Sequence, residues 1–200
     1  MNTELWIEKE AVHAEGFTYI CGVDEAGRGP LAGPVCAAAV ILPRGCVLEG
    51  LDDSKKLTEK RREALYDRII EQAASYGIAF AEVEEIETCN ILQATFLAMR
   101  RAVAQLDPQP ELVLVDGNRD PGLPFPSRCI VGGDRRCGDI AAASVLAKVT
   151  RDRFMCQLAE QYPEYGFNQH KGYGTRAHYA ALREFGPCPA HRLSFLKTMH

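Results

Sequence analysis

The 200-residue sequence predicts a mixed α/β fold in a single domain. Five short segments are rich in apolar, aromatic or β-branched residues and have the length of strands. Four longer segments repeat apolar residues at helical spacing. The two kinds of segment are interleaved along the chain, without an internal repeat or a low-complexity linker. The predicted strands are 17–24, 34–42, 78–83, 111–116 and 128–134, and the predicted helices are 59–76, 90–106, 139–162 and 176–185.

The first three predicted elements are two strands and a helix. Residues 17–24 (FTYICGVD) are aromatic and β-branched, which favours a strand. Residues 34–42 open with a proline, which the first position of a strand tolerates. Thr58 is the expected N-cap of the following helix, and we expect Gly77 to end that helix.

The later elements include the longest helix. Residues 90–106 carry a broad apolar stripe that a DPQP sequence at 107–110 interrupts. Residues 111–116 (ELVLVD) are almost wholly apolar, which is typical of a buried parallel strand. Residues 128–134 (RCIVGGD) are predicted as a strand that ends in an acid, and 139–162 as a long helix rich in small residues.

The bulk composition indicates a globular protein of the cytoplasm. Hydrophobic residues make up 46% of the chain and charged residues 25%, which is ordinary for a globular domain. No apolar run approaches the roughly 18 residues that a membrane span needs. The first 16 residues contain acids where a signal peptide would have a basic head. We therefore expect no membrane association and a cytoplasmic location.

The eight cysteines and the net charge carry less information. No two cysteines have the C-x-x-C spacing of a zinc site, so we expect reduced thiols, most of them in the core. A net charge of −4 argues weakly against a nucleic-acid partner, but two divalent cations would offset it. Basic residues are also locally dense, as at 60–62 and 135–136. Composition therefore leaves the partner open.

Acidic residues follow three of the predicted strands. Asp24 and Glu25 end the first, Asp116 ends the fourth, and Asp134 ends the fifth. If these strands are neighbours, the acids converge at one edge of the sheet, where open α/β sheets form their sites. Clustered carboxylates need cations, and an all-oxygen set suits a pair of Mg²⁺ or Mn²⁺ ions that assist phosphodiester cleavage. The alternative is that each acid caps a strand or binds a turn amide.

The loop after the first two acids is rich in glycine. GRGPLAG at 27–33 also fits a variant of the dinucleotide fingerprint of oxidoreductases, but Pro30 and Pro34 disfavour the helix that such a site needs. A β-turn-β loop is the better interpretation. Its glycines allow a sugar-phosphate chain to approach, Arg28 can donate to phosphate, and backbone groups can test for a ribose 2′-hydroxyl.

Seven segments in this order closely resemble ribonuclease HII, the bacterial type 2 ribonuclease H. The resemblance covers about residues 18–196 at family-like spacing, and the combination is far more specific than any single segment. The segments are GVDEAGRGPLAGPV (22–35), DDSKKLTEKRREALY (52–66), NILQATFLAM (90–99), LVDGN (114–118), AAASVLAKVTRDR (141–153), YGFNQHKGYGT (165–175) and HRLSF (191–195).

The resemblance implies a ribonuclease H-like fold with a central five-stranded mixed sheet flanked by helices and a helical C-terminal part. Residues 1–16 would be an N-terminal extension and about 165–200 the C-terminal helical segment of one catalytic domain. It also implies endonucleolytic cleavage of RNA in RNA–DNA hybrids, and 5′ to single ribonucleotides in duplex DNA. The products would carry 3′-hydroxyl and 5′-phosphate ends.

The resemblance also implies roles for individual residues. Asp24, Glu25, Asp116 and Asp134 would bind two Mg²⁺ or Mn²⁺ ions. Gly27, Arg28 and Gly29 would read the ribose 2′-hydroxyl, and Tyr173 would stack on the deoxyribose that follows the ribonucleotide. The residues expected to contact the substrate backbone or to support the acids are Lys55, Lys56, Ser144, Lys148 and Lys171.

One segment departs from the family pattern. Residues 135–140 read RRCGDI, where relatives often have a Pro-Glu pair and a serine before the first alanine. We expect Asp134 to be the fourth ligand, because it follows a predicted strand. Asp139 opens a helix, where it has an N-cap role available, and it could be a surface acid or a partner of the ligands.

Three classes of function remain to compare. The leading hypothesis is a metal-dependent ribonuclease that acts as a monomer. A nucleotide-dependent oxidoreductase rests on the glycine spacing alone. A non-catalytic hybrid-binding module is disfavoured, because a pure binder gains nothing from anions that face phosphates. A packing role is the alternative for Tyr173, and we expect the histidines other than His170 to be structural or exposed.

Overall fold

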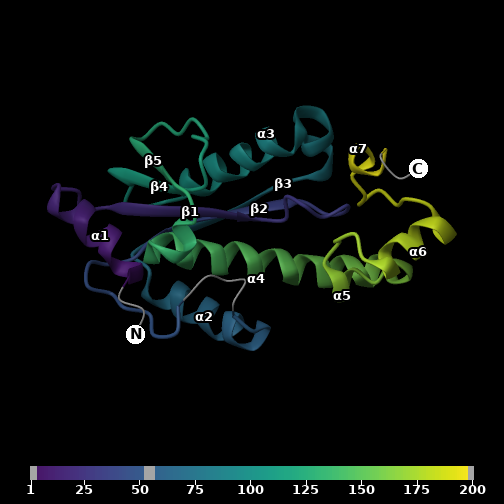
Figure 1. The fold of residues 1–200 in the computed structure, drawn as a ribbon, viewed down its shortest axis with the longest axis horizontal. Coiled ribbons are helices and arrows are strands. Elements are labelled where there is room, and N and C mark those ends of the chain that lie inside the picture. The colour runs from purple at the N-terminus through teal and green to yellow at the C-terminus, as the bar shows by residue number, and fades with distance from the viewer. Residues whose placement is uncertain (1–3, 52–56, 198–200) are drawn as a thin grey trace.

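A computed structural model of the protein describes residues 4–51 and 57–197. These residues form a five-stranded sheet in the order β3-β2-β1-β4-β5 (Figure 1). The pairs β1–β2 and β2–β3 are antiparallel, whereas β1–β4 and β4–β5 are parallel. The predicted mixed five-stranded sheet is therefore confirmed. The strands are β1 (Ile20–Ala26), β2 (Val35–Ile41), β3 (Ser75–Ala81), β4 (Leu112–Asp116) and β5 (Ser127–Ile130).

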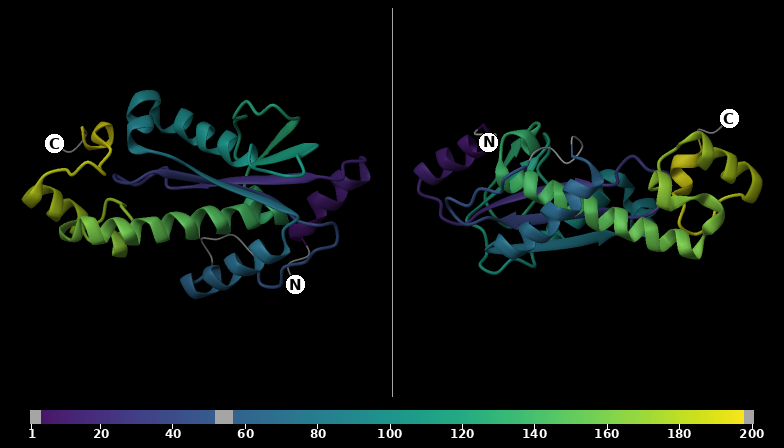
Figure 2. Two further views of the ribbon diagram at one scale, coloured as in Figure 1. Left: turned by 180° about the vertical axis from the view of Figure 1, so that it is seen from behind. Right: turned by 90° about the horizontal axis from the view of Figure 1, so that it is seen from below.

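Helices cover both faces of the sheet (Figures 1 and 2). One apolar cluster joins α3 to β1, β2 and β4, and another joins β2 to α2 and α4. Because β2 is packed on both faces, all of its residues are buried. The longer helices are α1 (Glu4–Ala14), α2 (Glu59–Gln72), α3 (Val83–Val103), α4 (Gly138–Gln161) and α6 (Arg176–Phe185).

The helical C-terminal part packs on the last turns of α4, at the end of the molecule away from α1 (Figure 2). Met155 and Leu158 of α4 share a third apolar cluster with Phe167 and Leu182. This arrangement confirms the predicted helical C-terminal part. Its elements are a short 3₁₀ helix (Pro163–Tyr165), α5 (Phe167–His170), α6 and α7 (Leu193–Leu196).

The boundary between α2 and β3 differs from the prediction. Thr58 is the N-cap as expected, and its side chain accepts a hydrogen bond from the Arg61 amide. The helix, however, ends at Gln72, and Gly77 lies inside β3 rather than at a helix end. A Cβ atom on Gly77 would lie 2.1 Å from the Ala102 carbonyl oxygen. The glycine is therefore needed for the close approach of α3 to the sheet.

The third helix begins earlier than the predicted residue 90. It starts at Val83 and kinks at Asn90, whose φ of 70° is left-handed. The Asn90 side-chain oxygen accepts hydrogen bonds from the amides of Leu92 and Gln93. Asn90 thus caps the second half of α3, which is the half that the apolar stripe predicts.

The fifth strand is shorter than the predicted 128–134. It ends at Ile130, and Gly132 then adopts a left-handed conformation with φ of 65°. Asp134 therefore lies in a 3₁₀ helix (Gly133–Arg135) that leads into α4, and not at the end of a strand.

The N-terminal residues form a helix that is anchored by a buried ion pair. Lys9 of α1 donates to Asp139 of α4 at 2.9 Å and to the Leu42 carbonyl at 2.8 Å. Asp139 is fully buried, and the N-cap of α4 is Cys137. The expected surface or N-cap role of Asp139 is therefore wrong. The acid instead receives a lysine from a helix that lies far away in the sequence.

The cysteines and the helices agree only in part with expectation. All eight cysteines are free, as expected, but only Cys21, Cys36 and Cys137 are buried, and two others are exposed. Cys46, Cys89 and Cys188 are half-buried and pack against the apolar clusters. Six of the eight thiols therefore lie in or against the core, as expected, and the two exposed ones do not. No helix of the described ranges combines the length and the apolar character that a membrane crossing requires.

Candidate active site

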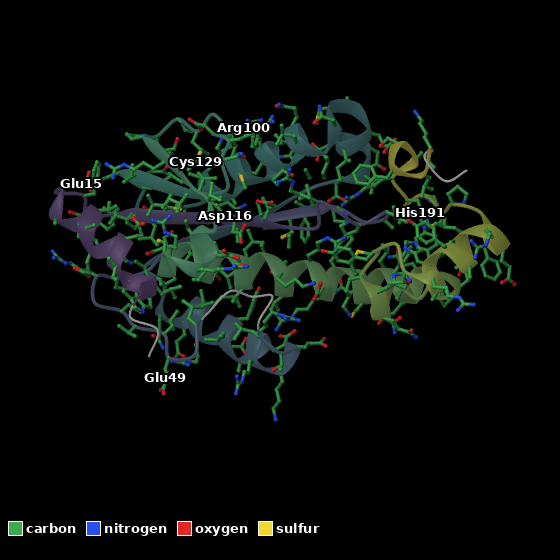
Figure 3. The ribbon with its side chains drawn as sticks, in the orientation of Figure 1. Glu15, Glu49, Arg100, Asp116, Cys129 and His191 are labelled. Carbon is green, nitrogen blue, oxygen red and sulfur yellow. The ribbon has the colours of Figure 1, made fainter. Side chains whose placement is uncertain are left out.

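Two of the predicted acids lie on neighbouring parallel strands. Val23 of β1 is paired with Val115 of β4, so the next residues, Asp24 and Asp116, are neighbours at the carboxyl ends of both strands. Figure 3 labels Asp116 near the centre of the molecule, close to the start of α4. Gly22 brings β1 against this helix, since a Cβ there would lie 2.1 Å from the Asp139 carbonyl carbon. The sheet and α4 thereby meet at the acids.

The acids repel one another. Burial raises the pKa of Asp24 well above its ordinary value, and the charges of Glu25 and Asp116 raise it further. The Glu25 amide, which donates to Asp24 at 2.7 Å, and the Ser144 hydroxyl oppose this shift. Hydrogen bonds therefore hold the Asp24 carboxylate in place. None of these influences on its pKa comes from a cationic side chain. A divalent cation at this point would relieve the repulsion.

Asp134 is buried and follows Gly133, the residue that joins the 3₁₀ helix to this pair. The amide of the preceding residue, Gly133, donates to Asp116 Oδ1 at 2.7 Å, so the 3₁₀ helix is attached directly to the end of β4. Within the described residues, no three His, Cys, Asp or Glu side chains are grouped so that they could hold a metal ion together. The carboxylate oxygens nevertheless suit a hard cation whose remaining ligands are water and substrate oxygens.

A pocket of about 210 Å³ opens next to the acids. It brings together the first two acids, the glycine-rich loop, α4 and the C-terminal part. Its lining residues are Asp24, Glu25, Ala26, Gly27, Arg28, Gly29, Ser144, Lys148 and Tyr173. A second, smaller pocket of about 80 Å³ shares Glu25 and Arg28, and Asp116 lines it together with residues of α3. Glu25 thus lies between the two pockets.

The glycine-rich loop forms one wall of the larger pocket. Gly27 has a φ of 99°, and a Cβ there would lie 2.0 Å from Arg151 Nε, so only glycine fits. Arg28 is exposed and makes an ion pair with Glu25 at 3.3 Å. A Cβ on Gly29 would lie 3.7 Å from the ring of Tyr173. Gly29 and Tyr173 therefore lie next to each other in the wall of the pocket, and Tyr173 is 45% exposed rather than packed in the core.

The loop continues into a strand. Residues 27–34 lead directly into β2, and no helix begins within them. A dinucleotide site of the oxidoreductase type needs the N-terminus of a helix at this point. The oxidoreductase alternative therefore has no structural support.

Of the lysines that were predicted to contact the substrate, only some can be placed, and these do not share one location. Lys148 lines the pocket one helical turn after Ser144 and pairs with Asp152 at 2.7 Å. Lys171 directs its ammonium group to the Asn168 carbonyl and to Cys156 Sγ, and it is not among the residues that line the pocket. Lys55 and Lys56 lie outside the described residues.

Two buried arginines beneath the loop were not predicted from the sequence. Arg151 donates to the carbonyls of Ala32, Pro34 and Lys171. Arg192 donates to four carbonyls of the loop, and its backbone amide donates to Leu31 O at 2.8 Å. Both arginines are far from the loop in sequence, so the residues around them do not indicate that they bind its carbonyls. The sequence indicates their importance only because Arg151 lies in the family-like segment AAASVLAKVTRDR and Arg192 in HRLSF.

A pair of buried histidines supports the segment that carries Tyr173. His178 Nε2 and His191 Nε2 are 3.0 Å apart, and His178 Nδ1 lies 2.9 Å from the Tyr173 carbonyl. If His178 donates to that carbonyl, His191 must donate to His178, and His191 Nδ1 then accepts the Cys188 amide at 3.0 Å. Both rings are therefore neutral in this arrangement.

Acid is expected to weaken this arrangement. Burial, with a smaller contribution from His178, lowers the pKa of His191 to about 4. Below the unfolded pKa of about 6.5 the unfolded chain takes up a proton that the folded protein does not, so stability falls until the pH reaches the folded pKa. Above pH 6.5 the contribution is constant. At about 1.4 kcal/mol per pKa unit, we expect a loss of roughly 2–3 kcal/mol across this window.

Urea unfolding at several pH values checks this expectation. His191→Gln is the matched control, because glutamine can still donate to His178 but does not titrate. The variant should show a shallower decline in unfolding free energy between pH 6.5 and 4. Parallel declines in the two proteins would assign the acid sensitivity to other groups.

The sequence was compared with known protein families, and the family model described as Ribonuclease HII matches residues 21–198. The chain belongs to the ribonuclease HII family. As a member of that family it is a ribonuclease H, an endonuclease. It is 51% identical to Ribonuclease HII of Caldicellulosiruptor bescii over 96% of this chain and 93% of the relative. It is 62% identical to Ribonuclease HII 1 of Methylibium petroleiphilum over 87% of this chain and 88% of the relative.

Solved ribonuclease H structures share this fold. Ribonuclease H2 from Pyrococcus horikoshii superposes with a TM-score of 0.73 at 27% identity, over 88% of this chain and 92% of that one. A Bst-RNase HIII structure in complex with Mn²⁺ gives a TM-score of 0.67 at 19% identity, over 88% of this chain and 65% of that one, and shows the likeness in fold alone.

Proposed function

We propose that this protein cuts the RNA strand of RNA–DNA hybrids. In duplex DNA with a single embedded ribonucleotide, it would nick the strand on the 5′ side of that ribonucleotide. The products would carry 3′-hydroxyl and 5′-phosphate ends. The observation that supports this most is one pocket in which Asp24 and Glu25 adjoin the loop 27–29 and Tyr173. A single nucleotide in this pocket could therefore contact both a metal ion held by the carboxylates and the backbone of the loop, which would bind its sugar.

The acids would hold two divalent ions, Mg²⁺ or Mn²⁺. We assign Asp24, Glu25, Asp116 and Asp134 as the ligands. When bound, these ions supply Lewis-acid activation of a water and stabilisation of the leaving oxygen. The protein's own contribution is to fix the carboxylates: Ser144 and the Glu25 amide hold Asp24, and the Gly133 amide holds Asp116.

The loop and the tyrosine would select the substrate. The backbone of Gly27, Arg28 and Gly29 is assigned to the ribose 2′-hydroxyl, which separates RNA from DNA. Tyr173 would stack on the next sugar, and it has the exposure that this contact requires. Lys148 lies in the pocket wall, where its charge can attract a phosphate. We retain Lys55, Lys56 and Lys171 as candidates for backbone contacts.

A single chain would suffice for this activity. The pocket already combines two of the assigned acids with the loop and Tyr173, so we propose a monomer with one catalytic domain that acts in the cytoplasm. A module that binds hybrids without cutting them is the weaker candidate. Its binding surface would place the carboxylates of Asp24 and Glu25 against phosphate.

The test uses an end-labelled DNA duplex that contains one ribonucleotide, with an RNA–DNA hybrid and an all-DNA duplex as controls. With Mg²⁺ or Mn²⁺ we expect one nick 5′ to the ribonucleotide, cleavage of the hybrid and no cleavage of DNA. A chelator should abolish both reactions. Cleavage of the hybrid alone would remove the junction role of the loop, and cleavage of neither substrate by folded protein would favour the binding module.

A further inference from the structure

The loop that faces the substrate is held from behind by one guanidinium group. Arg192 lies at the start of α7, 159 residues or more from the loop in sequence, and its side chain is fully buried. Its donors reach the carbonyls of Gly27 at 2.6 Å, Arg28 at 3.0 Å, Pro30 at 2.9 Å and Gly33 at 2.9 Å. Four of the five N–H groups of a guanidinium are thus used on a single loop.

These contacts determine which side of the loop peptides is available to a ligand. In a trans peptide the C=O and the next N–H point in opposite directions. Because the carbonyls of Gly27 and Arg28 turn toward Arg192, the amides of Arg28 and Gly29 turn away from it. The Pro30 peptide follows the same rule: its carbonyl is bound by Arg192, while the Leu31 amide donates to Gly172 O, next to Tyr173.

The rest of the C-terminal segment keeps the same register with the loop. The Arg192 amide donates to Leu31 O and the Gly33 amide donates to Ala190 O, both at 2.8 Å. Arg151 holds the carbonyls of Ala32 and Pro34, on either side of the Gly33 carbonyl that Arg192 holds. Both arginines therefore fix the end of the loop, whereas the contacts to residues 27–30 come from Arg192.

We propose that Arg192 is a positioning residue for ribonucleotide recognition: its guanidinium group fixes the 27–29 backbone so that the amides of Arg28 and Gly29 are presented to the 2′-hydroxyl. This inference rests on the proposed function of the loop. Arg192 does not line the pocket itself, so it acts through the loop rather than on the substrate.

The planar group is essential to this role. A guanidinium spreads its donors in a fixed fork that spans several acceptors, whereas a lysine ammonium is a compact point charge with three donors. Arg192→Lys keeps the positive charge and most of the apolar stem, but it cannot reach all four carbonyls. The substitution should therefore loosen the loop selectively while the fold is retained.

The test compares binding of two duplexes that differ in a single 2′-hydroxyl, one with an embedded ribonucleotide and one of DNA throughout, in buffer with Ca²⁺. The quantity of interest is the ratio of the two Kd values, because any unfolded fraction of protein affects both equally and cancels. We expect the wild type to prefer the ribonucleotide. In Arg192→Lys the ratio of the two Kd values should fall at least tenfold toward one. Its Kd for the DNA duplex should stay within twofold of the wild-type value.

A destabilised control separates positioning from general weakening of the fold. Leu65 of α2 is buried in the apolar cluster with α4 and does not line the pocket, so Leu65→Ala should lower Tm without changing the Kd ratio. If Arg192→Lys retains the wild-type ratio, the positioning role is wrong while the loop's function stands. If the wild type itself shows no preference, the proposed reading of the 2′-hydroxyl is wrong, and the inference is overturned with it. Should Leu65→Ala reduce the ratio as strongly as Arg192→Lys, loss of preference would follow from instability and the inference would also be wrong.

Discussion

Asp116→Asn is expected to abolish cleavage while the protein stays folded and binds the hybrid. Asparagine keeps the oxygen that accepts the Gly133 amide, so the attachment of the 3₁₀ helix to β4 is preserved. It removes the negative charge that a divalent ion needs in its ligand set. We expect the rate to fall at least about 10³-fold, which corresponds to roughly 4 kcal/mol of lost transition-state stabilisation.

The same substitution should leave stability unchanged or raise it when no metal is present. The charge of Asp116 is one cause of the raised pKa of Asp24, so its removal relieves repulsion at a buried carboxylate. Single-turnover cleavage assays should therefore show a loss of activity, while thermal unfolding in chelator shows a Tm that is unchanged or raised. Asp120→Asn is the control, because Asp120 lies in the loop after β4, is exposed and accepts the Gly122 amide. Full activity in Asp116→Asn would remove Asp116 from the metal site.

The position of Asp24 and Asp116 could be predicted because the signal is local. Each ends an apolar run of strand length, and parallel strands bring such residues to one edge of the sheet. The same logic was weaker for Asp134. The two residues before Asp134 are Gly132 and Gly133. Glycines can continue a strand, but they can also adopt the left-handed conformation that Gly132 has in the structure. Asp134 therefore lies in a 3₁₀ helix rather than at the end of a strand.

Other parts of the site depend on contacts between distant segments. The two arginines behind the loop lie in α4 and before α7, where their charge looks like that of a surface residue. Gly77 is a similar case, because the need for a glycine there comes from the close approach of Ala102 and Gln105 at the end of α3. Propensity cannot distinguish a glycine that ends a helix from one that admits a neighbour. These features appear only once the tertiary packing is known.

Lys9→Met is expected to destabilise the protein by about 3–5 kcal/mol, because it leaves Asp139 as a buried carboxylate without its cation. Asp139 is fully buried, burial already raises its pKa, and its Oδ2 atom has no hydrogen-bond partner in the structure. Thermal unfolding should show a fall in Tm of about 10 °C or more for a chain of this size. Glu8 provides the control, since its ion pair with Arg136 is at the surface and Glu8→Gln should cost less than about 1 kcal/mol.

The double variant Lys9→Met/Asp139→Asn should recover much of the loss. Asparagine can still accept the Leu42 amide, which donates to Asp139 Oδ1 at 2.8 Å, and it carries no charge to strand in the core. Cleavage assays well below Tm then decide what the departure at residues 135–140 does. If Asp139 only anchors α1, the double variant cuts at close to the wild-type rate. If Asp139 also supports Asp134 at the start of α4, stability returns in the double variant but cleavage does not.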